Sequence, residues 1–208
     1  FVGIAFDLAF KYRNPAIILA DGVIGQMMEK VVLPEQRTRL TDEEVIARCP
    51  WATTGRTHHR TPNIITSLEL DPAEMEKRNI HLQKKYAEIE ENEVRFEELH
   101  CEDAEYLIVA FGSCARIAQK AMEMAREEGI KVGLLRPITL WPFPSKAIAA
   151  RAAQVKGILT VELNAGQMVE DVRLAVECKV PVEHFGRLGG IVPDPDEVIT
   201  ALKEKLIK

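Results

Sequence analysis

The sequence has few of the residues that build disulfide or metal frameworks. It contains four cysteines in 208 residues, and they are scattered along the chain without a Cys-x-x-Cys pair: Cys49, Cys101, Cys114 and Cys178. Isolated cysteines of this kind indicate reduced thiols in a cytosol. Their spacing also fits neither an iron–sulfur cluster nor a zinc site. We therefore expect a cytoplasmic protein that holds no cluster of its own.

Long apolar runs and an excess of positive charge are also missing. No run approaches the roughly 20 apolar residues that a membrane helix needs, and no basic segment followed by an apolar one opens the chain. The net charge is −5, which argues against nucleic acid or an anionic membrane as a partner. The composition, 47% hydrophobic and 28% charged, is that of an ordinary globular protein.

The clearest pattern lies in the C-terminal half, which alternates strand and helix signals. Tyr106–Phe111 is an apolar run without polar alternation, typical of a strand covered on both faces. Gly129 stands where the following helix needs a C-cap, and Asp194-Pro195 where the last helix begins. The expected elements, in order, are strand 106–111, helix 114–128, strand 131–136, helix 144–154, strand 157–163, helix 166–177, strand 181–185 and helix 195–207. This order predicts an α/β fold with a doubly wound, mostly parallel sheet.

The pattern of the N-terminal residues indicates that they are part of another domain. Apolar residues recur at helical spacing from Val2 to about Tyr12, and Asn14-Pro15 ends that helix. Ala16–Ala20 reads as a buried strand. Because one helix and one strand cannot bury their own apolar faces, we expect residues 1–34 to be the C-terminal tail of a second α/β domain.

Residues 35–104 are expected to form a linker and a long amphipathic helix. Glu35–Leu70 shows little periodicity and includes His58-His59, which lack a second ligand cluster and are interpreted as loop histidines. Asp71-Pro72 begins a helix that we expect to form an arm of about 25 residues. One apolar residue recurs every seven positions on it: Met75, Leu82, Ile89 and Phe96. A single seam favours packing against this chain over a self-associating coiled coil. Residues 105–208 would then form the α/β domain.

The junction Phe111–Ala115 joins a strand to a helix. Backbone N–H groups at such a helix start can hold an anion, with Arg116 nearby, although a tight turn with a capped helix is the interpretation we favour. The same position could lower the pKa of Cys114, and here we favour a small packed thiol. No Ser–His–Asp, HExxH or GxSxG arrangement is present. The residues alone thus predict no catalytic group.

Several stretches carry a family resemblance. Tyr106–Pro144 resembles the C-terminal domain of transketolase-like thiamine diphosphate enzymes. Three more are similar to the α subunit of 2-oxoacid:ferredoxin oxidoreductases: Lys11–Glu29, Glu162–Arg173 and Gly186–Pro193. The linker segments Asn63–Leu68, Leu82–Tyr86 and Glu93–Arg95 resemble the branched-chain (2-oxoisovalerate) type.

The resemblance implies a multi-subunit enzyme. In that family a 2-oxoacid is decarboxylated on thiamine diphosphate, oxidised through iron–sulfur clusters to reduce ferredoxin, and transferred to coenzyme A. The resemblance implies that thiamine diphosphate and Mg²⁺ lie mainly on the β subunit and the clusters on other subunits, with none bound to this chain alone. Partners would be β-, γ- and δ-type subunits. The chain would be an α-subunit fragment, inactive alone, with the activating glutamate upstream of Phe1.

Six residues are candidates for contacts with partner subunits or the active-site entrance, because they follow expected strands: Asp21, Gly25, Gln26, Asn164, Gln167 and Arg187. Alternatives remain open. One is a transketolase relative without ferredoxin, such as a 2-oxoacid dehydrogenase E1 β chain or a deoxysugar synthase. Another is a stand-alone α/β module that binds an anion at residues 111–116.

Overall fold

The computed structural model describes residues 1–53 and 63–207. The pair His58-His59 lies outside the described residues. The chain divides into two units. One comprises Phe1–Met27 together with Gln83–Lys208, and the other comprises Met28–Leu82.

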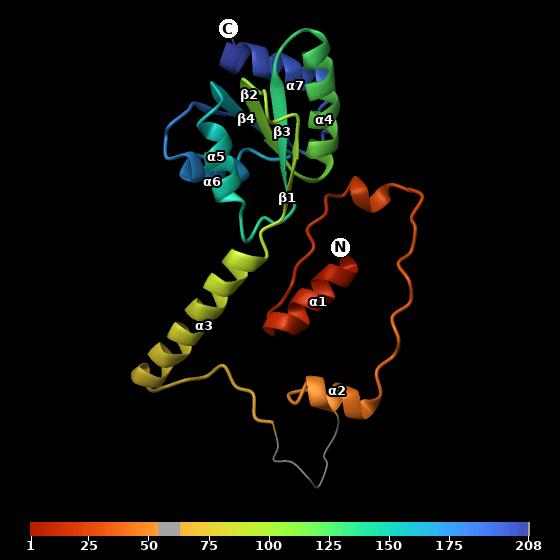
Figure 1. Cartoon of the computed structure of the whole chain (residues 1–208), viewed down its shortest axis with the longest axis vertical. Helices are drawn as coiled ribbons and strands as arrows, with labels where there is room; N and C mark the ends of the chain where they lie inside the picture. Colours follow the sequence, from red (N-terminus) through yellow and green to blue (C-terminus); the bar gives the residue numbers. More distant parts are fainter. Residues whose placement is uncertain (54–62, 208) are drawn as a thin grey trace. The chain divides into compact units, whose positions relative to one another are not determined.

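The first unit is built on a five-stranded sheet with the order β1-β3-β2-β4-β5 (Figure 1). Its strands are β1 (Phe96–Leu99), β2 (Tyr106–Ala110), β3 (Val132–Pro137), β4 (Gly157–Glu162) and β5 (Val182–Gly186). The four strands β2 to β5 run parallel, and β1 pairs with β3 in the antiparallel sense. The prediction of a mostly parallel α/β sheet is therefore confirmed.

Helices cover both faces of this sheet. Figure 1 shows α4 (Gly112–Glu127) and α7 (Pro195–Leu202) on one face, with α5 (Ser145–Ala152) and α6 (Met168–Val176) on the other. Ile108 and Leu159 pack with α4 and α7, whereas their neighbours Leu107 and Ile158 pack with α5 and α6. Burial on both faces explains why β2 is an uninterrupted apolar run and why β3 and β4 are largely apolar. Across residues 1–53 and 63–207, no helix is long and apolar enough to cross a membrane.

The expected helix ends are also found. After α4, Gly129 has a φ of 85°, its N–H bonds to the carbonyl of Arg126, and the N–H of Ile130 bonds to the carbonyl of Ala125. This pattern of two bonds around a left-handed residue is a Schellman motif, and glycine suits it because it has no Cβ. Asp194 caps α7 through a capping box with Glu197. A short π-helical segment, Lys203–Ile207, continues α7.

The prediction that Phe96 belongs to the long helix is wrong. That helix, α3, spans Pro72–Asn92, and Phe96 begins strand β1 at the edge of the sheet. In β1, Glu97 pairs with Arg136 and Glu98 pairs with Arg151. A four-residue strand with adjacent glutamates has neither an apolar run nor alternation, so its sequence does not indicate a strand.

The N-terminal helix α1 spans Val2–Tyr12 as predicted, but the strand predicted over Ala16–Ala20 is wrong. The side chains of Ile17 and Leu19 are 79% and 71% exposed. A strand needs a neighbour to accept and donate its backbone hydrogen bonds, and none of the strands in the described part of the chain pairs with this segment. A 3₁₀ turn, η1 (Ile24–Gln26), follows it.

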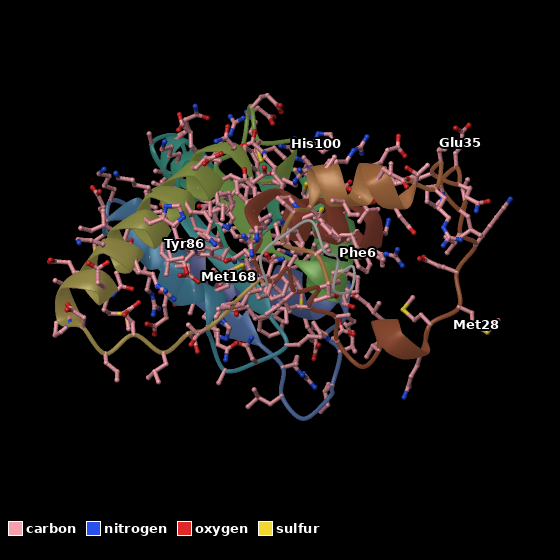
Figure 2. All side chains as sticks on the ribbon, turned by 90° about the horizontal axis from the view of Figure 1, so that it is seen from below. Phe6, Met28, Glu35, Tyr86, His100 and Met168 are labelled. Carbon is pink, nitrogen blue, oxygen red and sulfur yellow. The ribbon has the colours of Figure 1, made fainter. Side chains whose placement is uncertain are left out.

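The unit Met28–Leu82 contains a helix that the sequence analysis missed. This helix, α2 (Asp42–Arg48), begins with a capping box between Thr41 and Glu44. Its seven residues are too few to show a periodic apolar face, although Thr-x-x-Glu was a readable start signal. The flanking chain is extended, and Figure 2 shows Met28 projecting from it, with 98% of the residue exposed.

Candidate functional site

The carboxyl ends of four parallel strands lie along one edge of the sheet, which we call the carboxyl edge. The turn at Gly112 follows β2, the loop containing Trp141 follows β3, residues 163–167 follow β4, and residues 187–194 follow β5. In open α/β sheets this edge borders the ligand crevice or a partner surface. The candidates Asn164, Gln167 and Arg187 all lie here.

Glu162, the last residue of β4, determines the shape of the loop that follows it. Its side chain is fully buried. Oε2 accepts hydrogen bonds from the backbone N–H groups of Gln167 (3.2 Å) and Met168 (2.8 Å), and Oε1 accepts one from Val169 (3.0 Å). These donors would otherwise be unpaired at the start of α6, and the helix dipole favours a negative charge there. The carboxylate of Glu162 therefore caps the N-terminus of α6.

His184, from the neighbouring strand β5, holds the same loop from the other side. Its Nε2 lies 3.3 Å from the backbone oxygen of Asn164. Because a carbonyl oxygen can only accept, Nε2 is the donor in this bond. Nδ1 lies 3.2 Å from Oγ1 of Thr160 and 3.5 Å from Oε1 of Glu162. The side chain of Asn164 turns inward, and its Oδ1 accepts from the N–H of Gly166 at 2.7 Å.

Glycine at position 186 lets the two loops approach each other. A Cβ at Gly186 would lie 2.1 Å from the backbone oxygen of Asn164, a distance that no side chain tolerates. Glycine suits this position because it has no Cβ, so the backbone of residue 164 can approach it closely.

Arg187 forms an ion pair with Glu197 at the start of α7, and both side chains are about one-third exposed. Its backbone N–H also donates to the carbonyl of Glu162 at 3.2 Å. The pair joins the two ends of residues 187–197, a segment that carries the exposed side chains of Leu188 and Ile191. The guanidinium of Arg187 is thus already paired with a carboxylate of the same chain.

The Asp21 turn and the Phe111–Ala115 junction, treated separately in the sequence, come together in the structure. Oδ2 of Asp21 accepts from Oγ of Ser113 at 2.6 Å, and Oδ1 accepts from the N–H of Ile24 at 2.8 Å. The bond from Ser113 holds the pKa of Asp21 below its ordinary value. The negative group at the start of α4 is therefore this carboxylate. Gly25 and Gln26 lie in the exposed turn beside it.

Cys114 is a packed thiol, as favoured from the sequence. The residue is 3% exposed. Burial, together with the charges of Asp21 and Glu162, raises the pKa of its thiol to about 11. The helix start does not lower that pKa, because desolvation and two nearby carboxylates act in the opposite direction.

A cluster around Glu93 escaped the sequence analysis. Oε1 of Glu93 accepts from Nζ of Lys11 (2.7 Å) and from the hydroxyl of Tyr12 (2.8 Å), and Oε2 accepts from Nη2 of Arg95 (3.3 Å). Lys11 holds the pKa of Glu93 below its ordinary value, and the hydrogen bond to Glu93 raises the pKa of Lys11. The cluster joins the end of α1 to the segment between α3 and β1. These groups lie far apart in sequence, so no spacing indicated them.

Acidic side chains that could hold Mg²⁺ are not gathered at one place in the described part of the chain. Within residues 1–53 and 63–207, no group of three His, Cys, Asp or Glu side chains is arranged to hold a metal ion. Two carboxylates close to the carboxyl edge, Asp21 and Glu162, are bonded to N–H and O–H groups of the chain itself. We therefore assign no chemical step to a cofactor on this chain.

The fold and its carboxyl edge define a class, an α/β domain whose strand ends face a ligand or a partner. Residues 104–198 match the family model described as pyruvate:ferredoxin oxidoreductase core domain II. The chain is 45% identical over 200 residues to the ketoisovalerate oxidoreductase subunit VorB of Methanothermobacter marburgensis, covering 96% of this chain and 55% of that protein. It is 32% identical over 193 residues to the 2-oxoglutarate synthase subunit KorA of Archaeoglobus fulgidus, covering 91% and 53%.

A solved structure is also similar. It is the 2-oxoglutarate:ferredoxin oxidoreductase from Magnetococcus marinus, with 2-oxoglutarate, coenzyme A and succinyl-CoA bound. The TM-score is 0.60 at 25% sequence identity, over 71% of this chain and 28% of that one. The chain belongs to the 2-oxoacid:ferredoxin oxidoreductase subunits, as the motifs indicated. It spans about half the length of the curated relatives it matches.

Proposed function

We propose that this chain is part of the α subunit of a thiamine-diphosphate-dependent 2-oxoacid:ferredoxin oxidoreductase, and that the 2-oxoacid is 2-oxoisovalerate or a similar branched-chain acid. The enzyme would convert 2-oxoacid, coenzyme A and two oxidised ferredoxins into acyl-CoA, carbon dioxide, two reduced ferredoxins and a proton. The observation that carries the proposal is the 45% identity to a ketoisovalerate oxidoreductase subunit, against 32% to a 2-oxoglutarate synthase subunit over a similar span.

In this proposal the chain has a scaffold and interface role. Thiamine diphosphate, when bound, supplies the electron sink for decarboxylation, and a β subunit holds its diphosphate and Mg²⁺. Other subunits, of γ and δ type, carry the iron–sulfur clusters. The pairing of the edge carboxylates within the chain supports this division, because it leaves them committed to structure.

The proposed organisation keeps the boundaries expected from the sequence. Residues 1–34 would be the tail of a pyrimidine-binding-type domain, residues 35–104 the linker and helical arm, and residues 105–208 the transketolase C-terminal-like domain. The complex would lie in the cytoplasm. In the assembled enzyme we expect other parts of the complex to cover the N-terminal segment, because it exposes large apolar side chains that include Phe6, Ile17, Leu19 and Val32.

The carboxyl edge supplies the candidate contacts. Asn164, Gln167 and Arg187 lie on its loops, and the Asp21 turn, with Gly25 and Gln26, lies against the start of α4. We assign these residues to contacts with partner subunits or to the entrance of the active site.

An anaerobic pull-down tests the proposal. The tagged chain, extended upstream to the complete subunit encoded by its gene, serves as bait in lysate of its own host. We expect iron–sulfur partner subunits and a dye reduction that requires both a 2-oxoacid and coenzyme A. Recovery of a lipoyl-carrying enzyme in their place would contradict the ferredoxin assignment and favour the dehydrogenase type.

A further inference from the structure

The order of the strands gives the sheet a topological switch point between β2 and β4. The chain continues from β2 to β3 on one side of β2, and then crosses to β4 on the other side. In open α/β sheets a ligand binds outside the carboxyl ends of the strands at such a switch point. In this chain that position lies beside the turn after β2 and the loop after β4.

The N-terminal segment of the chain itself lies at this position. Oδ2 of Asp21 accepts a hydrogen bond, 2.6 Å long, from Oγ of Ser113, the second residue of α4. Burial raises the pKa of the neighbouring Cys114 thiol, and the charges of Asp21 and of Glu162, the last residue of β4, raise that pKa further. The Asp21 carboxylate and the end of β4 therefore lie close to the same thiol.

Asp21 is the point at which this part of the segment is held. Residues 15–20 and 22–27 are exposed, and Asp21 between them is half-buried. The turn is also closed on itself, because Oδ1 of Asp21 accepts from the N–H of Ile24 at 2.8 Å and its carbonyl accepts from the N–H of Gly25 at 3.2 Å. A segment with so few buried groups opens at a lower free energy than the sheet does.

We propose that residues 21–26 are an internal plug, a turn of the chain that occupies the switch point and is held there by the bond between Asp21 and Ser113. Breaking this bond opens the plug and uncovers the start of α4, while the sheet keeps its structure. The inference goes beyond the scaffold role proposed above, because it gives the chain a closed and an open state at its carboxyl edge.

The plug should open without the release of α1, because α1 has attachments of its own. Lys11 and the hydroxyl of Tyr12 bond to Glu93, and Lys85 bonds to Asn14. These contacts lie before residue 15, so they hold α1 whether or not the turn that follows it is closed. Residues 15–27 are thus fastened separately at their two ends.

Two substitutions at one position separate the hydroxyl from the rest of the side chain. Ser113→Ala removes the donor to Asp21, whereas Ser113→Thr keeps it. Ser145→Ala is the matched control, because Ser145 is an exposed serine in the first turn of another helix, α5. None of these changes removes a buried apolar side chain.

Hydrogen exchange of the backbone amides is measured on the protein as wild type and as the three variants. The amides of Ile24 and Gly25 report the plug, and those of α1 and β2 report the rest of the unit. We expect exchange at Ile24 and Gly25 to be roughly fivefold to tenfold faster in Ser113→Ala, the effect of losing one hydrogen bond to a charged group that is partly exposed. In Ser113→Thr and Ser145→Ala exchange should stay within about twofold of wild type, and the amides of α1 and β2 should be unchanged in all variants.

Three results would overturn the proposal. Equal exchange at Ile24 in wild type and Ser113→Ala would mean that another contact holds the turn. Equal acceleration in Ser113→Ala and Ser113→Thr would mean that the hydroxyl has no part in closing the plug. Acceleration of the β2 amides together with that of Ile24 would mean that the turn opens only when the sheet does.

Discussion

At the scale of single residues, two buried carboxylates hold segments of the chain in place through hydrogen bonds. The carboxylate of Glu162 accepts three backbone N–H groups, and that of Glu93 accepts from Lys11, Tyr12 and Arg95. Hydrogen bonds of this type are stronger than neutral ones and compensate the cost of burial. Both glutamates thereby join segments that are separate in sequence.

Replacing Glu162 with glutamine should destabilise the protein by about 1–3 kcal/mol. The amide keeps the volume of the side chain, but its NH₂ group faces backbone N–H donors and leaves at least one of them unpaired. Urea denaturation measures the change in the free energy of unfolding. Glu127→Gln, on an exposed part of α4, is the matched control and should change it little. Equal stability of the two variants would refute the capping role.

The cysteines should differ sharply in reactivity. Burial is the main cause that raises the pKa values of Cys101 and Cys114 to about 11, and Cys178 is exposed. Since the thiolate is the reactive form, iodoacetamide at pH 8 should label Cys178 first and the two buried thiols only after denaturation. Mass spectrometry reports the order of labelling.

The raised pKa values of Cys101 and Cys114 also predict a pH dependence of stability. Between pH 9 and 11 the thiols lose their protons more readily in the unfolded chain than in the folded one, so the free energy of unfolding should fall as pH rises over this range.

The candidate residues were predictable from the sequence in position but not in partners. That Asn164, Gln167 and Arg187 lie at strand ends followed from the alternation of strands and helices. That Arg187 pairs with Glu197, or that His184 meets the carbonyl of Asn164, depends on how neighbouring strands align. The spacing of these residues in the sequence does not determine how the strands align.

At the scale of elements, the sequence predicted what carries a local signal. The strand β2 is an apolar run, β3 and β4 are largely apolar, and local signals mark Gly129 after α4 and the capping box at the start of α7. The sequence did not predict the strand β1, and it predicted a strand at Ala16–Ala20 where the structure has none. The edge strand β1 is charged yet finds a partner in β3, whereas the apolar segment 16–20 has no strand beside it in the described chain. Pairing is a tertiary property.

Arg151 joins α5 to β1 through Glu98, and lysine should replace it only in part. Its Nε and Nη2 bond to the two carboxylate oxygens of Glu98, at 2.9 and 2.6 Å. Lysine cannot form this two-point contact. Because both side chains are about one-quarter exposed, we expect a loss of only about 1 kcal/mol in thermal or urea unfolding.

The control for that substitution is Arg136→Lys. Arg136 makes one bond, from Nη1 to Glu97 at 2.7 Å, with Glu97 largely exposed. A single exposed ion pair contributes little, so this variant should match wild type. A loss as large as that of Arg151→Lys would contradict the role of the two-point contact, because Arg136 makes only a single bond to its glutamate.

At the scale of the molecule, polar contacts hold Phe1–Met27 to the α/β unit. These contacts include the Glu93 cluster, the Asp21–Ser113 bond and a bond between Lys85 and Asn14. Tyr86 also meets Trp141 edge-on, at 5.8 Å between ring centroids, which packs α3 against the loop after β3. Several of the side chains that attach the N-terminal segment, among them Lys11, Asp21 and Glu93, are titratable.

Attachment of α1 should therefore depend on pH. Glu93 has a lowered pKa, so its contribution is present above the ordinary value of 4.5 and is lost as pH falls below it. Lys11 has a raised pKa, so its contribution is present below 10.5 and is lost as pH rises above it. Hydrogen exchange of the α1 amides should be slowest between these limits, and Glu93→Gln should weaken the acid dependence. An unchanged acid dependence in that variant would contradict the role of Glu93.

The most direct test of the account is the 2-oxoacid preference of the complete enzyme assembled around this chain. Reduction of a viologen dye, measured without oxygen, gives kcat/KM for 2-oxoisovalerate, 2-oxoglutarate and pyruvate with coenzyme A present. The account predicts turnover that requires this subunit and coenzyme A, with the highest kcat/KM for 2-oxoisovalerate. A preference for 2-oxoglutarate or pyruvate would contradict the branched-chain assignment, and no reduction with any 2-oxoacid would contradict the oxidoreductase function itself.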